Sequence, residues 1–324
     1  MAEKLGNGGN GQESYDPATG RYVGNSKTVS KISDGVYGDD VKNFFDSLDD
    51  VGKNNFTQDF DEFLSQGKQT VQPTTKLTDS DIATYKANNP NLHDGEVDAA
   101  ANAIREYEKI EPEITSNLID IANDYGGMLI GLDHRMKSLD STVKRMEKNG
   151  GGRGDEFDNE KALYGVKDLL RYTACFDEED FDNSVLQMSR AMKQDYALVR
   201  ILNSMKQGRL YKGINCLFTD GKGHVFEMQF HTPESIKVKD GIIVDLDNKT
   251  ETRDASLSTS HDLYEQIREV KTRAKNGLAT PQEIYASKKK NQDLFDMWNN
   301  VKNHPKIRLR KGMLSQNFKK RTNQ

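Results

Sequence analysis

The chain has 324 residues, 34% of them hydrophobic and 30% charged, with a formal net charge of −5. The negative net charge argues against a protein whose whole surface binds nucleic acid. The length allows one or two domains, and the low apolar and high charged fractions predict that part of the chain lies outside the packed core. No run is apolar enough to span a bilayer or act as a secretory signal, so we expect a cytoplasmic protein without membrane contact. Cys175 and Cys216 lack a CxxC partner and are expected to be buried apolar residues.

The amino-terminal region is low in apolar residues. Residues 1–31 are rich in Gly, Asn, Ser and Lys and predict a disordered leader. Residues 32–94 predict an acidic, partly helical arm and linker, with nine acidic residues between Ser33 and Gln66 interleaved with phenylalanines. This arm either forms amphipathic helices that dock on a basic surface or remains solvated.

Helical periodicity begins near Asp94. Apolar residues recur at steps of three and four from position 97 to 110, and Pro112 is expected to open a second helix that ends at Tyr125 and two glycines. A short apolar run at 128–132 follows.

A polar segment after this run predicts a phosphate site. Ser138 is a plausible N-cap for a helix over 139–148, whose amino end would lie just after Arg135 and Lys137. Two cations, a hydroxyl and free backbone N–H groups in one small volume favour a bound phosphate, although solvated Arg and Lys are common. A glycine-rich turn at 149–155 ends the segment.

The next strand is predicted over 166–176, with Asp168 near its start. A carboxylate in this position is either a turn residue or a metal ligand. A helix over 181–194 and a strand over 197–202 are expected to follow.

A hairpin is predicted between Tyr211 and Ser235, with two β-prone runs joined by residues 219–223. Side chains alternate along its second run. The apolar side chains Phe226, Met228 and Phe230 therefore point to one face, and the polar side chains Glu227, Gln229 and His231 point to the other. The polar face is either simply solvated or functional.

Helices are expected over 258–275 and 281–303, which makes the fold class α+β, a mixed β-sheet of about five strands flanked by helices. The carboxy-terminal part, 281–324, is predicted to be a helix and a basic tail. Its last 24 residues contain eight Lys or Arg and no acid, as in a solvated arm or an RNA contact.

Residues 95–280 are predicted to form one domain, which over about 95–275 resembles the synthetase domain of the RelA/SpoT family, nucleotide pyrophosphokinases with a nucleotidyltransferase-like fold. The motifs that carry the resemblance are R-x-K-x-x-x-S-x-x-x-R from Arg135 to Arg145, the early Asp168, Y-K-G-I-N from Tyr211, E-M-Q-F-H-T from Glu227, and His261 with Leu263-Tyr264-Glu265. No single motif is specific, but their order and spacing together are.

The resemblance implies a role for each matching residue. Arg135, Lys137, Ser141, Arg145 and the nearby Arg171 would bind ATP. Asp168 and Glu227 would be the catalytic pair that holds Mg²⁺. The acceptor would meet Tyr211, which stacks on its base, and Lys212, Asn215, Gln229 and His231.

Three departures from the family pattern leave the identity of the acceptor open. Thr173 stands where the family has an arginine, Asn215 replaces a histidine, and His231 replaces an arginine. Such changes resemble divergent, toxin-like or phage-borne members, which implies growth inhibition and an antitoxin or phage structural partner, in the cytoplasm or the virion. The acceptor would be GDP or GTP, an adenine nucleotide, or the 3′ end of tRNA. The alternative is a catalytically inactive virion or toxin-complex protein that only binds.

Overall fold

The computed structural model describes residues 14–16, 21–23, 29, 32–33, 35, 39–66, 69, 71–93, 95–150, 157–305 and 307. The chain divides into two compact units, Met1–Lys68 and Gln69–Gln324.

The first unit contains helices in the acidic arm, as predicted. They are α2 (Asp39–Ser47) and α3 (Asp50–Gln66), and the ring of Phe56 lies 5.3 Å from that of Phe44. Most of the expected leader lies outside the described residues. Within it, β1 (Ser14–Asp16) and β2 (Arg21–Val23) pair as antiparallel strands, which the composition did not predict.

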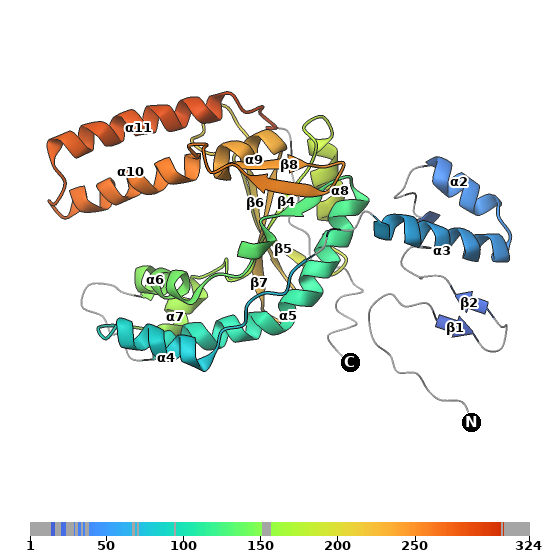
Figure 1. The fold of residues 1–324 in the computed structure, drawn as a ribbon, viewed down its shortest axis with the longest axis horizontal. Coiled ribbons are helices and arrows are strands. Elements are labelled where there is room, and N and C mark those ends of the chain that lie inside the picture. Colours follow the sequence, from blue (N-terminus) through green and yellow to red (C-terminus); the bar gives the residue numbers. More distant parts are fainter. Residues whose placement is uncertain are drawn as a thin grey trace. The chain divides into compact units, whose positions relative to one another are not determined.

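A five-stranded mixed sheet organises the second unit (Figure 1). Its strands lie in the order β3, β4, β7, β6, β5, and β4 runs parallel to β7 while the other pairs are antiparallel. The strands are β3 (Met128–Ile130), β4 (Arg171–Cys175), β5 (Ala197–Asn203), β6 (Ile214–Thr219) and β7 (Val225–His231). The predicted α+β class with a mixed sheet of about five strands is confirmed.

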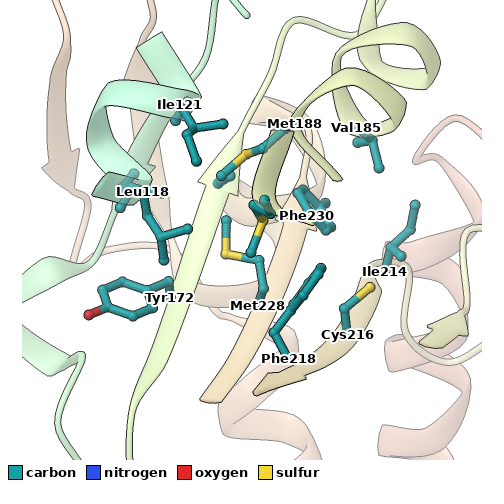
Figure 2. Packing of buried hydrophobic residues seen from close by; sticks show 14 of the residues in the cluster. Leu118, Ile121, Tyr172, Val185, Met188, Ile214, Cys216, Phe218, Met228 and Phe230 are labelled. Atoms are coloured by element: carbon teal, nitrogen blue, oxygen red, sulfur yellow. The ribbon is translucent and has the colours of Figure 1, made fainter. Parts of the chain in front are cut away.

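The main core lies on one face of this sheet, against α5 (Glu96–Asp124) and α8 (Phe181–Met192). Figure 2 shows Met228 and Phe230 of β7 together with residues of both helices. With Phe226, these two side chains are fully buried, as the alternation predicted. Burial of each large apolar side chain contributes about 1.5–3 kcal/mol.

Helix α5 continues through Pro112, so the prediction of two helices was wrong. A proline inside a helix costs about 3 kcal/mol, because it lacks an N–H and its ring crowds the preceding turn. Ile104, before the proline, packs in a second apolar cluster, and Leu118, after it, packs in the main core. Burial on both sides of the proline offsets its cost.

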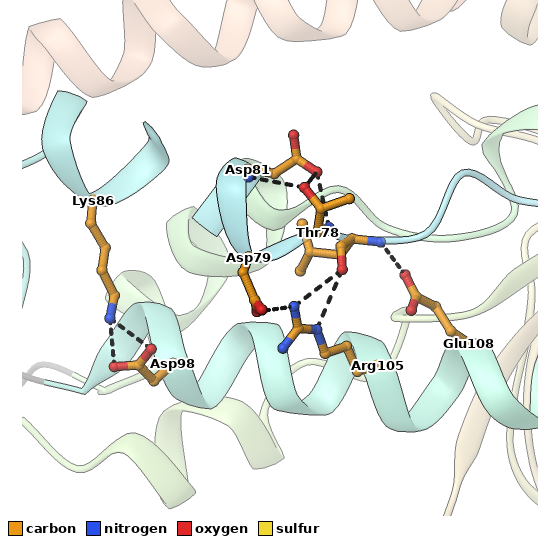
Figure 3. Close-up of polar contacts among 8 residues, drawn as sticks. Thr78, Asp79, Asp81, Lys86, Asp98, Arg105 and Glu108 are labelled. Atoms are coloured by element: carbon orange, nitrogen blue, oxygen red, sulfur yellow. Dashed lines mark hydrogen bonds and ion pairs between the residues drawn. The ribbon is translucent and has the colours of Figure 1, made fainter. Parts of the chain in front are cut away.

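A short helix that the sequence analysis missed, α4 (Asp79–Asn88), packs on α5 (Figure 3). Its capping box joins Thr78 and Asp81, each side chain accepting the other's backbone N–H. Arg105 of α5 donates to Asp79 at 2.6 Å. The capping box is a sequence signal that marks where such a helix begins.

The opposite face of the sheet is covered as well. The elements on it are α9 (Pro233–Asp240), β8 (Ile242–Asp245), β9 (Thr250–Arg253), α10 (Ser260–Lys275) and α11 (Pro281–Asn299). Gln229 and His231 are only 4% and 0% exposed, so a simply solvated polar face is excluded for both.

The remaining elements are η1 (Leu132–His134), α6 (Leu139–Gly150) and α7 (Asn159–Tyr164), of which α6 and α7 pack on α5 in the second apolar cluster. Both cysteines are free and buried, as predicted. The predicted glycine-rich turn lies largely outside the described residues, as does the basic tail beyond position 307. No helix in the described part of the chain has the length and apolar character needed to cross a membrane.

Buried tyrosines predict a loss of stability in alkali. Burial raises the pKa of Tyr196 to about 12 from an ordinary value of 10.0. Between these values the unfolded chain loses the phenolic proton while the folded chain keeps it, so rising pH favours unfolding. The stability that Tyr196 contributes is complete below pH 10.0 and lost as pH rises through about 12, a change of about 2–3 kcal/mol.

Urea unfolding at about pH 8 and about pH 11 checks this, since Tyr196→Phe should lose less stability than the natural chain between the two. The matched control is Tyr164→Phe, because Tyr164 is 76% exposed. Equal alkaline losses in both variants would contradict the assignment.

Candidate functional site

A pocket of about 290 Å³ lies at the amino end of α6, where the sequence predicted a phosphate site. Its lining consists of His134, Met136, Lys137, Ser138, Ser141, Asp168 and Arg171. The predicted cap is present, because the N–H of Ser141 donates to Ser138 Oγ at 3.2 Å. Lys137, Ser141, Asp168 and Arg171 of the predicted set are thus brought together.

The acid of this pocket pairs with its lysine. Lys137 Nζ donates to Asp168 Oδ2 at 2.8 Å, and both side chains are partly exposed. Asp168 lies before β4 rather than inside it, because the strand begins only at Arg171. The predicted strand was therefore too long at its amino end.

Arg171 connects the pocket to the polar face of the sheet. It is exposed, lines the pocket, and lies opposite Glu227 in the parallel register of β4 and β7. Paired residues on neighbouring strands point to the same face. Arg171 forms no ion pair within the described part of the chain, so its guanidinium is available to an anion.

Glu227 is held by two side-chain amides. Asn215 Nδ2 donates to Glu227 Oε1 at 3.1 Å, and Gln229 Nε2 donates to Glu227 Oε2 at 2.9 Å. Asn215 belongs to β6, where it lies opposite Gln229. Three of the predicted residues therefore form one hydrogen-bonded group on the polar face.

Tyr211 and His231 form the inner end of this group. Tyr211 Oη contacts Asn215 Oδ1 at 2.9 Å and His231 Nε2 at 3.0 Å, and the tyrosine ring packs edge-on against Trp298. His231 Nδ1 contacts Ser235 Oγ at 2.8 Å. His231 is fully buried and both its ring nitrogens are hydrogen-bonded within the protein, so it is not exposed to an acceptor nucleotide, which was its predicted role.

Burial sets the protonation of both rings. It lowers the pKa of His231 well below its ordinary value, and the charge of Lys239 adds to this effect. It raises the pKa of Tyr211, with Glu227 as the next cause. Both side chains are therefore neutral near neutral pH.

Arg135 does not line the pocket. Its side chain is 3% exposed and its guanidinium binds Glu111 Oε1 at 2.5 Å, the carbonyl of Leu132 at 2.6 Å and the carbonyl of Gln72 at 2.8 Å. Arg135 and Lys137, the expected R-x-K pair, would point to the same side only if the backbone between them were extended. Arg135 instead has helical dihedral angles at the end of η1, which separates it from Lys137.

Two further cations differ from expectation. Lys212 is 1% exposed and its ammonium donates to the carbonyl of Val301, just after α11. A cation there stabilises the carboxyl end of a helix, so Lys212 holds the fold rather than an acceptor. Arg145 is exposed on α6 and does not line the pocket.

The sequence analysis missed Lys239 of α9. Its ammonium binds Asp240 Oδ2 at 2.9 Å and Gln229 Oε1 at 3.1 Å, and burial, reinforced by Arg171, lowers its pKa against the opposing effect of Asp240. Proline at the first helical position and glycine just after the last one mark α9 in the sequence. That signal places Lys239 on a helix but not over Gln229.

The donor set bears on magnesium. Asp168 lines the pocket together with Arg171, and Glu227 lies opposite Arg171 on the next strand, but no cluster of three or more His, Cys, Asp or Glu suited to a metal occurs among the described residues. Magnesium in nucleotide enzymes is commonly held by one or two carboxylates together with substrate phosphates. The residues therefore suit a magnesium–nucleotide complex better than a bare ion.

No family model matches the chain, and no curated protein is significantly similar to it. Among solved structures, a chain in the crystal structure of the complex between the Type VI effector Tas1 and its immunity protein is 16% identical, with a TM-score of 0.33. The match covers 64% of this chain and 95% of that one. A TM-score of this size does not establish a shared fold.

Proposed function

We propose that the chain is an ATP-dependent pyrophosphokinase of the RelA/SpoT type, which transfers the β,γ-pyrophosphate of ATP to a 3′-hydroxyl. The observation that supports this best is the continuity of one surface. The pocket at the amino end of α6 contains Lys137, Asp168 and Arg171, and Arg171 lies directly beside Glu227 on the next strand.

The pocket suits phosphates by charge and by size. Lys137 and Arg171 are cations, and the amino end of α6 carries the partial positive charge of the helix dipole. At about 290 Å³ its volume lies just below the usual range for ligand pockets, about 300–1,000 Å³. It therefore holds the triphosphate, and the nucleoside extends beyond it.

The chemistry needs positioning and charge neutralisation more than covalent help. The 3′-oxygen of the acceptor bonds to the β-phosphorus, the bond from that phosphorus to the α-phosphate oxygen breaks, and AMP leaves. Glu227 takes the hydroxyl proton. Lys137 and Arg171 offset the negative charge of the phosphates.

Magnesium would be held by Asp168 and Glu227 together with the phosphates, and it would supply further charge neutralisation there. Asp168 accepts from Lys137, and Glu227 accepts from Asn215 and Gln229, so both carboxylates are already oriented by neighbours.

Transfer of label from γ-labelled ATP tests the proposal. We expect one of GDP or GTP, an adenine nucleotide, or deacylated tRNA to gain label while an equal amount of AMP forms. Arg171→Ala should weaken ATP use strongly. Lys144→Ala is the matched control, because Lys144 is an exposed cation on α6 that pairs with Asp140. The absence of both label transfer and AMP with every acceptor would contradict the proposal.

A second candidate is a catalytically inactive binding protein. The buried positions of Arg135 and Lys212 favour it, because these two cations were expected to bind ligands but instead contact Glu111 and the carbonyl of Val301 inside the fold. This candidate predicts no label transfer and no binding of Mg-ATP at millimolar concentration, which calorimetry measures.

A further inference from the structure

The amides that hold Glu227 are themselves held at their far ends. Lys239 Nζ donates to Gln229 Oε1 at 3.1 Å, and Tyr211 Oη lies 2.9 Å from Asn215 Oδ1. A carboxylate only accepts hydrogen bonds and an ammonium only donates them. Gln229 lies between these two groups, so its amide has one allowed orientation.

The same logic fixes the second amide and then the histidine. Asn215 must direct Nδ2 to Glu227, so its Oδ1 accepts the single hydroxyl proton of Tyr211. Tyr211 Oη can then only accept from His231, which requires a proton on His231 Nε2. His231 is neutral because burial lowers its pKa, so its Nδ1 carries no proton and accepts from Ser235 Oγ.

We propose that His231, as the neutral Nε2–H tautomer, is a positioning residue for Glu227, acting through Tyr211 and Asn215. The chain of hydrogen bonds has a defined direction that ends at the capping box of α9, where Ser235 Oγ accepts the N–H of Thr232.

Two local features support this arrangement. A Cβ atom at Gly213 would lie 2.8 Å from His231 Cε1 and closer still to Tyr211 Oη, so the two rings meet only because this residue is glycine. Asn215 and His231 are also two of the positions where the chain departs from the pattern of the RelA/SpoT family. The structure joins these two departures through one hydroxyl group.

The chain of hydrogen bonds can also run in the opposite direction, and one substitution selects that direction. In Glu227→Gln the new amide presents an N–H₂ group to either Asn215 or Gln229, and one of these must turn over. Gln229 cannot, because its N–H₂ group would then face Lys239, which is also a donor. Asn215 therefore turns, Tyr211 donates to His231 Nε2, and His231 carries its proton on Nδ1. Ser235 Oγ then donates to the carbonyl of Thr232, 3.1 Å away.

NMR of isotope-labelled histidine in the full chain near neutral pH measures this tautomer directly. The chain has six histidines, and the His231 signal is assigned by its loss in His231→Gln. We expect the Nε2–H tautomer in the natural chain and the Nδ1–H tautomer in Glu227→Gln. In Lys239→Met combined with Glu227→Gln, Gln229 is also free to turn, so the Nε2–H tautomer should become populated again.

The matched control is Asp168→Asn, which also changes a carboxylate to an amide but contacts Lys137 rather than this chain of bonds. It should leave His231 in the Nε2–H form. An Nδ1–H tautomer in the natural chain, or the same tautomer with and without the Glu227 carboxylate, would overturn the proposal. If His231 stays in the Nδ1–H form in the double variant, Lys239 is not what fixes the orientation of Gln229.

The catalytic value of this positioning rests on the proposed function, whereas the tautomer does not, so the two fail separately. Tyr211→Phe keeps the ring against Trp298 but lacks the hydroxyl. We expect kcat to fall about 10–100-fold with KM for ATP unchanged, as for other residues that orient a reacting group. An unchanged kcat in a chain that shows the expected tautomers would refute the positioning role alone.

Discussion

We expect Glu227→Gln to lower the rate of AMP release from ATP by a factor of about 10²–10⁴, because in the proposed mechanism Glu227 takes the acceptor proton and would help to hold magnesium. Glutamine preserves the size of the side chain, and Asn215 can turn to satisfy it, so the fold should be retained. Rates with saturating Mg-ATP and the acceptor found by label transfer give the comparison, with circular dichroism to check folding.

Glu234→Gln provides the control for this substitution. Glu234 is an exposed glutamate in the first turn of α9, so the same chemical change is made outside the site. Its rate should match that of the natural chain. Full turnover in Glu227→Gln would mean that another group takes the proton.

Glu111→Ala destabilises the second unit by about 3–5 kcal/mol, the usual cost of removing one partner from a buried ion pair. Glu111 and Arg135 are each 3% exposed, and the same Glu111 carboxylate also accepts from Thr115. The alanine leaves the Arg135 cation buried without an anion. Since folded domains are stable by only about 5–15 kcal/mol, this variant should be marginal.

Urea unfolding, followed by fluorescence of the single tryptophan and by circular dichroism, measures this loss. The tryptophan, Trp298, is buried and is therefore a sensitive reporter. Glu106→Ala is the control, because Glu106 pairs with Lys109 on the exposed side of the same helix, a pair worth less than about 1 kcal/mol. Equal losses of unfolding free energy in both variants would show that the buried ion pair contributes no more to stability than the exposed one.

The sequence predicted what depends on neighbours along the chain. The β7 hairpin followed from alternation and from a turn of suitable length, and the apolar trio of Phe226, Met228 and Phe230 is buried as expected. Ser138 caps α6 as expected, because an N-cap is a contact over three residues. The class of the fold followed from the order of these elements.

The sequence did not predict what depends on partners far away in the chain. Arg135 is internal because Glu111 lies 24 positions earlier on α5, and Lys212 is internal because Val301, just after α11, lies 89 positions later. A cation in a motif looks the same whether its anion is a phosphate or a buried carboxylate. The sequence analysis also did not predict that other elements cover the polar face of β7, because no residue near β7 in the sequence indicates that Trp298 packs edge-on against Tyr211.

The length of α5 has a mechanical consequence for the second unit. Its 29 residues extend about 44 Å, and its fully buried apolar residues before Pro112, such as Ile104, and after it, such as Leu118, belong to different apolar clusters. Loss of one cluster leaves half of this continuous helix without its packing, and Pro112, which lacks a backbone N–H, makes that half less able to stay helical by itself. We therefore expect the two clusters to lose their structure together, which limited proteolysis near Pro112 would show.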